Sequence, residues 1–315
     1  MFKKFFSLFS VTFFVAGIFI LLGNFTKTFA APNENTQWYW LKSDDKYSKF
    51  FDPDSVRVIR QAKVIKKIKN ANGEIEEFEK IIPTEIEAWT KTAYTYEGAA
   101  ETISNYKINS TLPDAKVLSY SLALFRIIPQ TRTIQYARED FYNAKNQVIW
   151  SRADGPVKEI NSQSFDEDFY CAIVDEIFKQ GEVDRKNAKD RWMDLWTYTN
   201  SEGYTTTCTG DTTTMQMKGT NLILWQWQET KNLEGKVVEI KFLKKAVNLP
   251  QGTEKITAGE IWTPTSKGFR EYTDKNEGSY KMIKSTDPEY KGLVRLRAYA
   301  RGFSDWVSRY QFSKQ

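Results

Sequence analysis

The chain has 315 residues, and none of them is histidine. This absence excludes the commonest general acid or base, the commonest metal ligand, and every Ser-His-Asp or Cys-His catalytic system. Net charge is +5, but three lysines lie in residues 1–30; the other 42 basic and 40 acidic residues leave +2, which indicates neither a nucleic-acid nor an anionic-membrane partner.

Residues 1–30 have the pattern of a secretory signal peptide. Lys3 and Lys4 form a basic start, an uncharged apolar stretch runs from Phe5 to Leu22, and small residues precede a cleavage point after Ala30. The sequence therefore predicts an exported protein that is periplasmic, on the cell surface or secreted. An uncleaved N-terminal anchor is the alternative, because about 18 apolar residues approach the length of a membrane span.

Residues 36–180 are predicted to form a first α+β domain, made mainly of an antiparallel sheet. Runs rich in aromatic and β-branched residues, bounded by polar turns, predict strands at residues 38–41, 47–51, 85–96, 116–128, 132–142 and 147–152. An amphipathic helix follows, with Ser164-x-x-Glu167 as a capping box and Phe165, Phe169 and Ile173 at helical spacing. Such a helix is expected to cover one face of the sheet.

Within this domain, residues 64–82 predict a charged β-hairpin. The first strand alternates with lysines, Asn72-Gly73 supplies a type I′ turn, and the returning strand is rich in acids. In this register Lys69 faces Glu76 across the hairpin. We interpret the element as a solvated hairpin whose charges set its register and block edge aggregation, with a partner-contacting hairpin as the alternative.

Residues 190–315 are predicted to form a second, related α+β domain after a charged segment at residues 180–190, which fits a linker or an extended helix end. Strands are predicted at residues 192–199, 204–209, 221–230 and 236–247, and a closing amphipathic helix begins after Asp287. Corresponding landmarks indicate a duplication: Trp40, Tyr47, Asp54 and Trp89 in the first half match Trp196, Tyr204, Asp211 and Trp225 in the second.

Cys171 and Cys208 are the only cysteines. An even pair in an exported protein predicts a disulfide, which would contribute roughly 3 to 4 kcal/mol in the chain-entropy description. Two buried free thiols are the alternative.

Several residues between Trp38 and Phe178 carry a family resemblance. They are Trp40 with its polar turn, an aromatic strand ending in Asp52 and Ser55, Trp89-x-Lys91, a hairpin with Trp150, and a closing helix with Cys171. In these features the first half resembles the surface-adhesin protein E-like family of exported bacterial domains. The resemblance implies an antiparallel sheet packed on a helix and, as in the best-known members, adhesion to host matrix or plasma proteins. This chain lacks their lipid-attachment cysteine and is about twice as long, and no binding residue carries over.

Aromatic residues make up 15% of the chain and are the most plentiful candidates for contact with a partner. We expect Trp40, Trp89, Trp196 and Trp225 to pack in cores, and we select Trp38, Trp227 and Trp262 as candidate ligand contacts.

The sequence predicts an exported, non-catalytic binding or adhesion protein with a protein or glycan partner at the cell surface or envelope, and no cofactor or metal. A structural envelope component is the alternative. A carboxylate-dependent hydrolase is less favoured, because nothing in the sequence selects a pair of acids.

Overall fold

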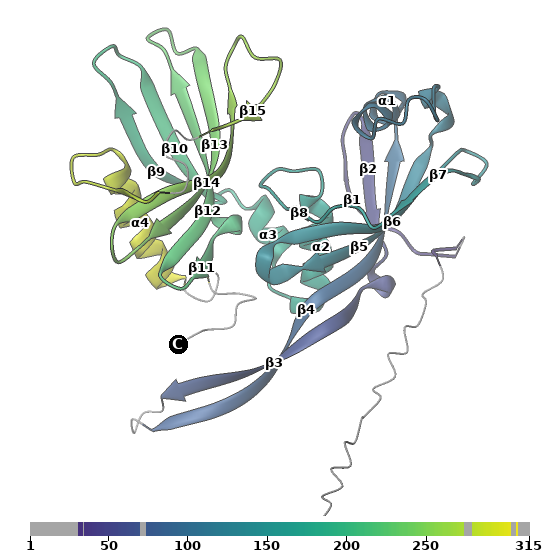
Figure 1. Ribbon diagram of the computed structural model, residues 1–315, viewed down its shortest axis with the longest axis horizontal. Helices are drawn as coiled ribbons and strands as arrows, with labels where there is room; N and C mark the ends of the chain where they lie inside the picture. Colours follow the sequence, from purple (N-terminus) through teal and green to yellow (C-terminus); the bar gives the residue numbers. More distant parts are fainter. Residues whose placement is uncertain (1–30, 34, 70–73, 274–278, 304–306, 308–315) are drawn as a thin grey trace, which may run out of the picture.

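The computed structural model describes residues 31–33, 35–69, 74–273, 279–303 and 307 (Figure 1). These residues form two antiparallel sheets of eight strands each and four α-helices; the described part of the chain is 21% helical and 46% strand. The predicted class, two tandem α+β domains, is therefore confirmed. The predicted leader, residues 1–30, lies outside the described residues. Within the part of the chain that the structure describes, no helix is long and apolar enough to cross a membrane.

The first sheet contains the strands β1 Tyr39–Ser43, β2 Tyr47–Phe51, β3 Arg57–Lys69, β4 Ile75–Tyr94, β5 Tyr120–Ile128, β6 Thr133–Tyr142, β7 Val148–Ala153 and β8 Lys158–Glu159. Helix α2, Glu167–Phe178, supplies one side of its main core, where Phe169 and Ile173 lie with Ile86 and Phe125 of the sheet. Helix α1, Tyr96–Asn105, belongs to a smaller core at one end of the domain.

The second sheet contains the strands β9 Trp192–Thr199, β10 Thr205–Asp211, β11 Gln216–Lys218, β12 Asn221–Lys231, β13 Val237–Asn248, β14 Thr253–Trp262, β15 Arg270–Glu271 and β16 Lys281–Met282. Helix α4, Glu289–Gly302, buries Leu293 and Leu296 against Leu195 and Leu222, as its apolar stripe predicts. The short helix α3, Glu182–Asn187, lies in the segment between the two sheets.

The two sheets share one topology. Six strands lie side by side in chain order, β1-β2-β4-β5-β6-β7 in the first sheet and β9-β10-β12-β13-β14-β15 in the second. In both, one additional strand pairs with the third of these six (β3 with β4, β11 with β12) and another pairs with the fifth (β8 with β6, β16 with β14). This correspondence supports the predicted duplication.

A matching turn follows the second strand of each sheet. In the first domain the Trp89 amide donates to Ser55 Oγ at 2.8 Å, and in the second the Trp225 amide donates to Thr214 Oγ at 3.0 Å. The Trp89–Trp225 match therefore agrees with these hydrogen bonds.

The matched aspartates differ from the prediction. Asp52 accepts the amide of the residue two places later, at 3.1 Å, and Asp211 does the same at 2.9 Å. Asp52, not Asp54, is thus the counterpart of Asp211. Equal spacing from Tyr47 and Tyr204 selected the wrong residue, because β10, Thr205–Asp211, is two residues longer than β2, Tyr47–Phe51, and so places its aspartate further from the tyrosine.

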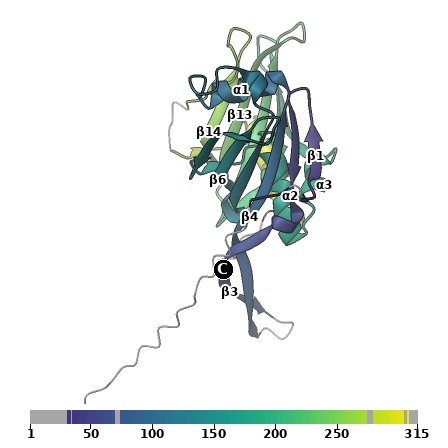
Figure 2. The same cartoon turned by 90° about the vertical axis from the view of Figure 1, so that its right-hand side faces the viewer.

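Strands β3 and β4 extend far beyond the first sheet as a two-stranded hairpin (Figures 1 and 2). Its register is one residue away from the prediction, because Lys69 pairs with Ile75 and Ile68 pairs with Glu76. A shift of one residue exchanges the faces on which side chains lie. The predicted Asn72-Gly73 turn lies outside the described residues.

Candidate functional site at the domain junction

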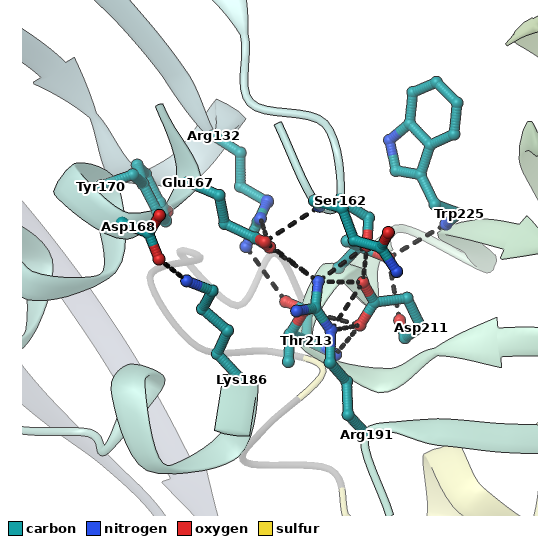
Figure 3. A network of polar contacts seen from close by, with 12 residues as sticks. Arg132, Ser162, Glu167, Asp168, Tyr170, Lys186, Arg191, Asp211, Thr213 and Trp225 are labelled. Carbon is teal, nitrogen blue, oxygen red and sulfur yellow. Dashed lines mark hydrogen bonds and ion pairs between the residues drawn. The ribbon is translucent and has the colours of Figure 1, made fainter. Parts of the chain in front are cut away.

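Arg191 links the two domains through buried charges. Its Nη2 atom lies 2.9 Å from Glu167 Oε1, at the start of α2, and 2.6 Å from Asp211 Oδ2, at the end of β10 (Figure 3). The side chains of Glu167 and Asp211 are only 1% and 0% exposed. Because an unpaired buried carboxylate is costly, the first domain's acid and the second domain's acid both depend on this arginine.

Neighbouring groups complete the junction network. Arg132 donates to the Thr213 carbonyl at 3.1 Å and lies 3.5 Å from Glu167 Oε1, while Arg191 donates to Ser162 Oγ at 2.7 Å. The Thr213 amide and hydroxyl donate to Asp211 Oδ1 at 2.9 and 2.6 Å, and Ser162 also donates to Asp211. The positive charges of two arginines thus neutralise the negative charges of two carboxylates, as expected where buried ion pairs hold two domains together.

The pKa of Asp211 reflects this environment. Burial alone would raise it, but the hydrogen bonds and positive charge of Arg191, with the hydroxyls of Ser162 and Thr213, outweigh burial and lower the pKa. Asp211 therefore stays ionised at neutral pH.

Further contacts fasten the domains outside the network. Arg185 of α3 donates to the Thr212 carbonyl and to the Tyr299 hydroxyl, both at 2.9 Å. Lys244 of β13 forms an ion pair with Glu159 of β8. The two repeats are consequently held as one body.

A cavity of about 730 Å³ lies beside the network. Strands β1 and β2, the start of α2, and α3 form its wall, and Glu167 and Arg191 are shared with the network. The lining residues all come from the first domain and from the segment between the two sheets, so the cavity lies on the first domain's side of the junction. Its volume is in the range of known ligand sites.

Two lysines in this wall share one carboxylate. Lys49 Nζ donates to Asp168 Oδ2 at 2.8 Å and to the Phe165 carbonyl at 2.7 Å, and lies 4.1 Å from the Phe165 ring centre. Lys186 of α3 pairs with the other oxygen of Asp168. The side chains of Lys49 and Lys186 are 7% and 16% exposed, so both ammonium groups have lost most of their water.

Both lysines have unusual pKa values. Burial lowers the pKa of Lys49 to about 8, and the positive charge of Lys42 adds to the shift against the opposing effects of Asp166, Asp44 and Glu167. Burial also lowers the pKa of Lys186 to about 8; Glu167 opposes this shift, while Lys42, Arg191 and Lys49 increase it. The cavity therefore concentrates positive charge.

A second cavity, of about 280 Å³, lies within the first domain. It contains Glu139 and Asp166, which accept hydrogen bonds from Tyr106 at 2.7 Å and Tyr136 at 2.6 Å. Burial raises the pKa of Glu139. Each acid also has its own cation, Arg152 at 2.8 Å from Glu139 and Lys158 at 2.6 Å from Asp166.

The three candidate tryptophans do not form one site. Trp38 is half-buried, 5.9 Å from Lys91 Nζ in the first domain. Trp227 is half-buried between Phe242 and Phe269, with ring centres 6.0 and 6.1 Å away, and half-buried Trp262 pairs in register with Ile240. Trp38 therefore lies in the other domain, whereas Trp227 and Trp262 lie on one face of the second sheet, on the two strands that flank β13.

Among the tryptophans predicted to be core, Trp40 is the exception. Trp89 and Trp225 are buried, and Trp196 packs against the second core. Trp40, however, is 60% exposed on the edge strand β1, where its indole donates to Ser43 Oγ at 2.8 Å. The prediction for Trp40 is wrong because β1 has no neighbouring strand on its outer side.

The cysteines are free, buried thiols. Cys171 lies in the core of the first domain and Cys208 in the core of the second. The predicted Cys171–Cys208 disulfide is thus not formed in this structure, because each side chain packs inside a different domain.

We expect neither thiol to react in the folded protein. Burial raises the pKa of Cys208 to about 12 and that of Cys171 well above its ordinary value, so the reactive thiolate is scarce in both. Unfolding without reductant should release two thiols that react with a maleimide, counted by mass spectrometry. If the unfolded protein is labelled only after a reductant is added, the predicted Cys171–Cys208 disulfide is present after all.

Comparison of the chain with family models, with curated proteins and with solved structures finds no match. In the described part of the chain, no group of three or more Cys, Asp and Glu residues is placed to hold a metal ion. The site is therefore interpreted from its own geometry.

Proposed function

We propose that this is an exported, non-catalytic binding protein of the bacterial cell surface or envelope, and that it contacts a protein partner through the hairpin of β3 and β4. The observation that carries the proposal is the outer part of this hairpin, residues 62–69 and 75–82, called the arm below. Strand β5 pairs with β4 only from Ile86 onward, so in the arm β3 and β4 pair with each other alone. Both views show the arm projecting from the body (Figures 1 and 2).

The arm exposes apolar side chains. Ile65, Ile75 and Ile81 are 54%, 67% and 64% exposed. The register pairs Ile65 with Glu79, Lys63 with Ile81 and Lys69 with Ile75, which places the three isoleucines on one face. An isolated two-stranded ribbon is marginally stable in water, so an added strand or a covering surface would stabilise it.

The charges of the arm favour an extended, acidic segment as the partner. The part of β3 in the arm has four lysines and no acids, and Lys63 pairs with Glu79 of β4 at 2.6 Å. A strand added at the free edge of β3 would gain main-chain hydrogen bonds, and acids in it would offset the lysines. The same charges oppose pairing with another basic strand.

We expect a photo-crosslinking amino acid in place of Ile81 to join one discrete protein, either of the envelope of native cells or of host plasma added to them. The same amino acid in place of Leu233, which is 79% exposed in a turn of the second domain, should give no such product. A variant that lacks residues 63–81, in which Asn-Gly joins Ala62 to Ile82, should keep its thermal stability and bind the isolated partner at least tenfold more weakly. Ala62 and Ile82 are paired directly across the strands and both have a backbone amide, so the shortened turn can form its hydrogen bonds.

Equal crosslinking at both positions, no product at Ile81, or unchanged affinity without the arm would contradict the proposal. The identity of the partner separates adhesion, where it is a host protein, from a structural role, where it is an envelope protein of the same cell.

A carboxylate hydrolase is the second candidate, because Glu139 and Asp166 line one cavity and the pKa of Glu139 is raised. Both acids are held by a tyrosine and a cation of their own, which leaves neither available as a nucleophile. The binding function is therefore preferred.

A further inference from the structure

The cavity at the domain junction has features of a ligand site that is independent of the arm. Its volume, about 730 Å³, lies within the range that holds a drug-sized molecule and greatly exceeds the size of a single ion. Its wall is held in place by the ion pairs of Asp168 with Lys49 and Lys186 and by the pairing of Arg191 with Glu167, so the site is pre-organised, which lowers the entropic cost of binding.

Positive charge in the cavity exceeds negative charge. Glu167 and Arg191 are matched within the junction network, which leaves Lys42, Lys49 and Lys186 facing Asp44 and Asp168. Asp44 is further occupied by the backbone amides of Lys46 and Tyr47, at 2.8 and 2.7 Å. Asp168 alone serves both buried lysines. An incoming anion would offset this excess.

Polar and aromatic groups complete the wall. Gln163, Ser164 and Asn187 line the cavity together with Tyr47 and Phe165, whose rings meet edge to face with centres 5.0 Å apart. The Ser164 hydroxyl is buried and has no hydrogen-bond partner among the described residues, and the predicted capping box is not formed, since the Gln163 amide donates to Glu167 instead. Hydroxyl and amide groups beside aromatic rings match the mixed polar and apolar surface of a sugar.

We infer that the junction cavity binds an acidic saccharide of about two sugar units, whose carboxylate or phosphate lies between Lys42, Lys49 and Lys186. The lowered pKa values of the two buried lysines agree with this assignment, since an anion would favour their charged forms. The hydroxyls of the ligand would pair with Gln163, Ser164 and Asn187.

Isothermal titration calorimetry at pH 7 tests this inference with three probes: a disaccharide that contains glucuronate, a disaccharide phosphate, and the neutral disaccharide cellobiose. We expect at least one acidic probe to bind and cellobiose to bind at least tenfold more weakly. The acidic probe that binds more tightly identifies the anionic group. Inorganic phosphate alone should bind more weakly than the acidic disaccharides, because it fills little of the cavity.

The matched variants are Lys186→Gln in the cavity and Lys179→Gln outside it. Lys179 is also near the end of the first domain's helix, but it is exposed and pairs with Glu176 on the surface. We expect K186Q to weaken binding of the acidic probe at least tenfold and K179Q to leave it unchanged, with both variants retaining the wild-type circular dichroism spectrum.

The rate at which the lysines are acetylated provides a second measurement. Amines with a pKa near 8 are largely deprotonated at pH 8.5, so acetic anhydride should modify Lys49 and Lys186 faster than Lys179, and the acidic probe should protect them. Absence of binding by both acidic probes, equal binding of cellobiose, or protection of Lys179 to the same degree would overturn the inference. None of these outcomes bears on the arm.

Discussion

Replacing Arg191 by methionine is expected to uncouple the two domains and to lower the free energy of unfolding by about 3–5 kcal/mol. Methionine fills a similar volume but leaves Glu167 and Asp211, 1% and 0% exposed, without their shared cation. Arg132 contacts Glu167 at 3.5 Å and can offset only one of the two carboxylates. Scanning calorimetry should then show two transitions where the wild-type protein shows one, because the domains no longer stabilise each other.

Arg60→Met is the control for this variant. Arg60 is 78% exposed and pairs with Glu85 at 2.9 Å, so its removal should cost less than about 1 kcal/mol and preserve a single transition. If R191M keeps one transition and loses less than about 1 kcal/mol, the junction network does not join the domains. The variant Arg191→Lys keeps the positive charge and should recover part of the free energy of unfolding that R191M loses. Lysine reaches one carboxylate but lacks the forked geometry of arginine.

The repeat structure explains why the junction forms where it does. Asp52 and Asp211 occupy the same turn in the two domains, and both accept an amide two residues later. Asp52 is half-buried, with a pKa raised by burial, whereas Asp211 is fully buried and its pKa is lowered by Arg191. In the first repeat the aspartate thus only stabilises its own turn. In the second repeat it also pairs with Arg191 and so helps to join the two domains.

Local patterns were sufficient to predict the fold. Alternating strands, polar turns and the apolar stripe of α4 predict two α+β units, because each depends on residues close together in the chain. The predicted register of the arm was wrong by one residue, because Lys69 pairs with Ile75 and not with Glu76. The length of the hairpin loop sets this register, and the sequence is compatible with loops that differ by one residue. Exposure of Trp40 was missed because the sequence does not show which strand lies at an edge.

The candidate site could not be predicted in the same way. Lys49 and Asp168 are 119 residues apart, and nothing in the sequence around either residue indicates that they are in contact. The sequence pattern assigned Asp168 no role in a site, and it predicted residues 180–190 to be a linker or an extended helix end, whereas α3 in this segment carries Lys186. One signal was present: a charged segment between two domains is a natural source of side chains for their junction.

The stability of the protein is expected to rise as pH increases from 8 to 9, by an amount on the order of 1 kcal/mol. Lys49 and Lys186 have folded-state pKa values of about 8, below the ordinary value of 10.5 that they regain on unfolding. Between these values the unfolded chain binds more protons than the folded protein, so the slope of unfolding free energy against pH is positive. Below about pH 7 both states are protonated and these lysines contribute no slope.

Chemical denaturation at pH 7, 8 and 9 would measure this rise, with the variant Lys49→Met for comparison. The rise in K49M should be smaller than in the wild type by about 1 kcal/mol, because only Lys186 still releases a proton on folding, while Lys179→Met should behave as the wild type. Cys171 and Cys208 act in the opposite direction in every variant, because burial raises their pKa above the ordinary 9.0 and the unfolded chain loses thiol protons that the folded protein keeps as pH approaches 9. The range stops at pH 9 to limit this contribution. Equal slopes in K49M and wild type would mean that Lys49 stays charged when buried, and its ion pair with Asp168 would then stabilise the fold at every pH from 7 to 9.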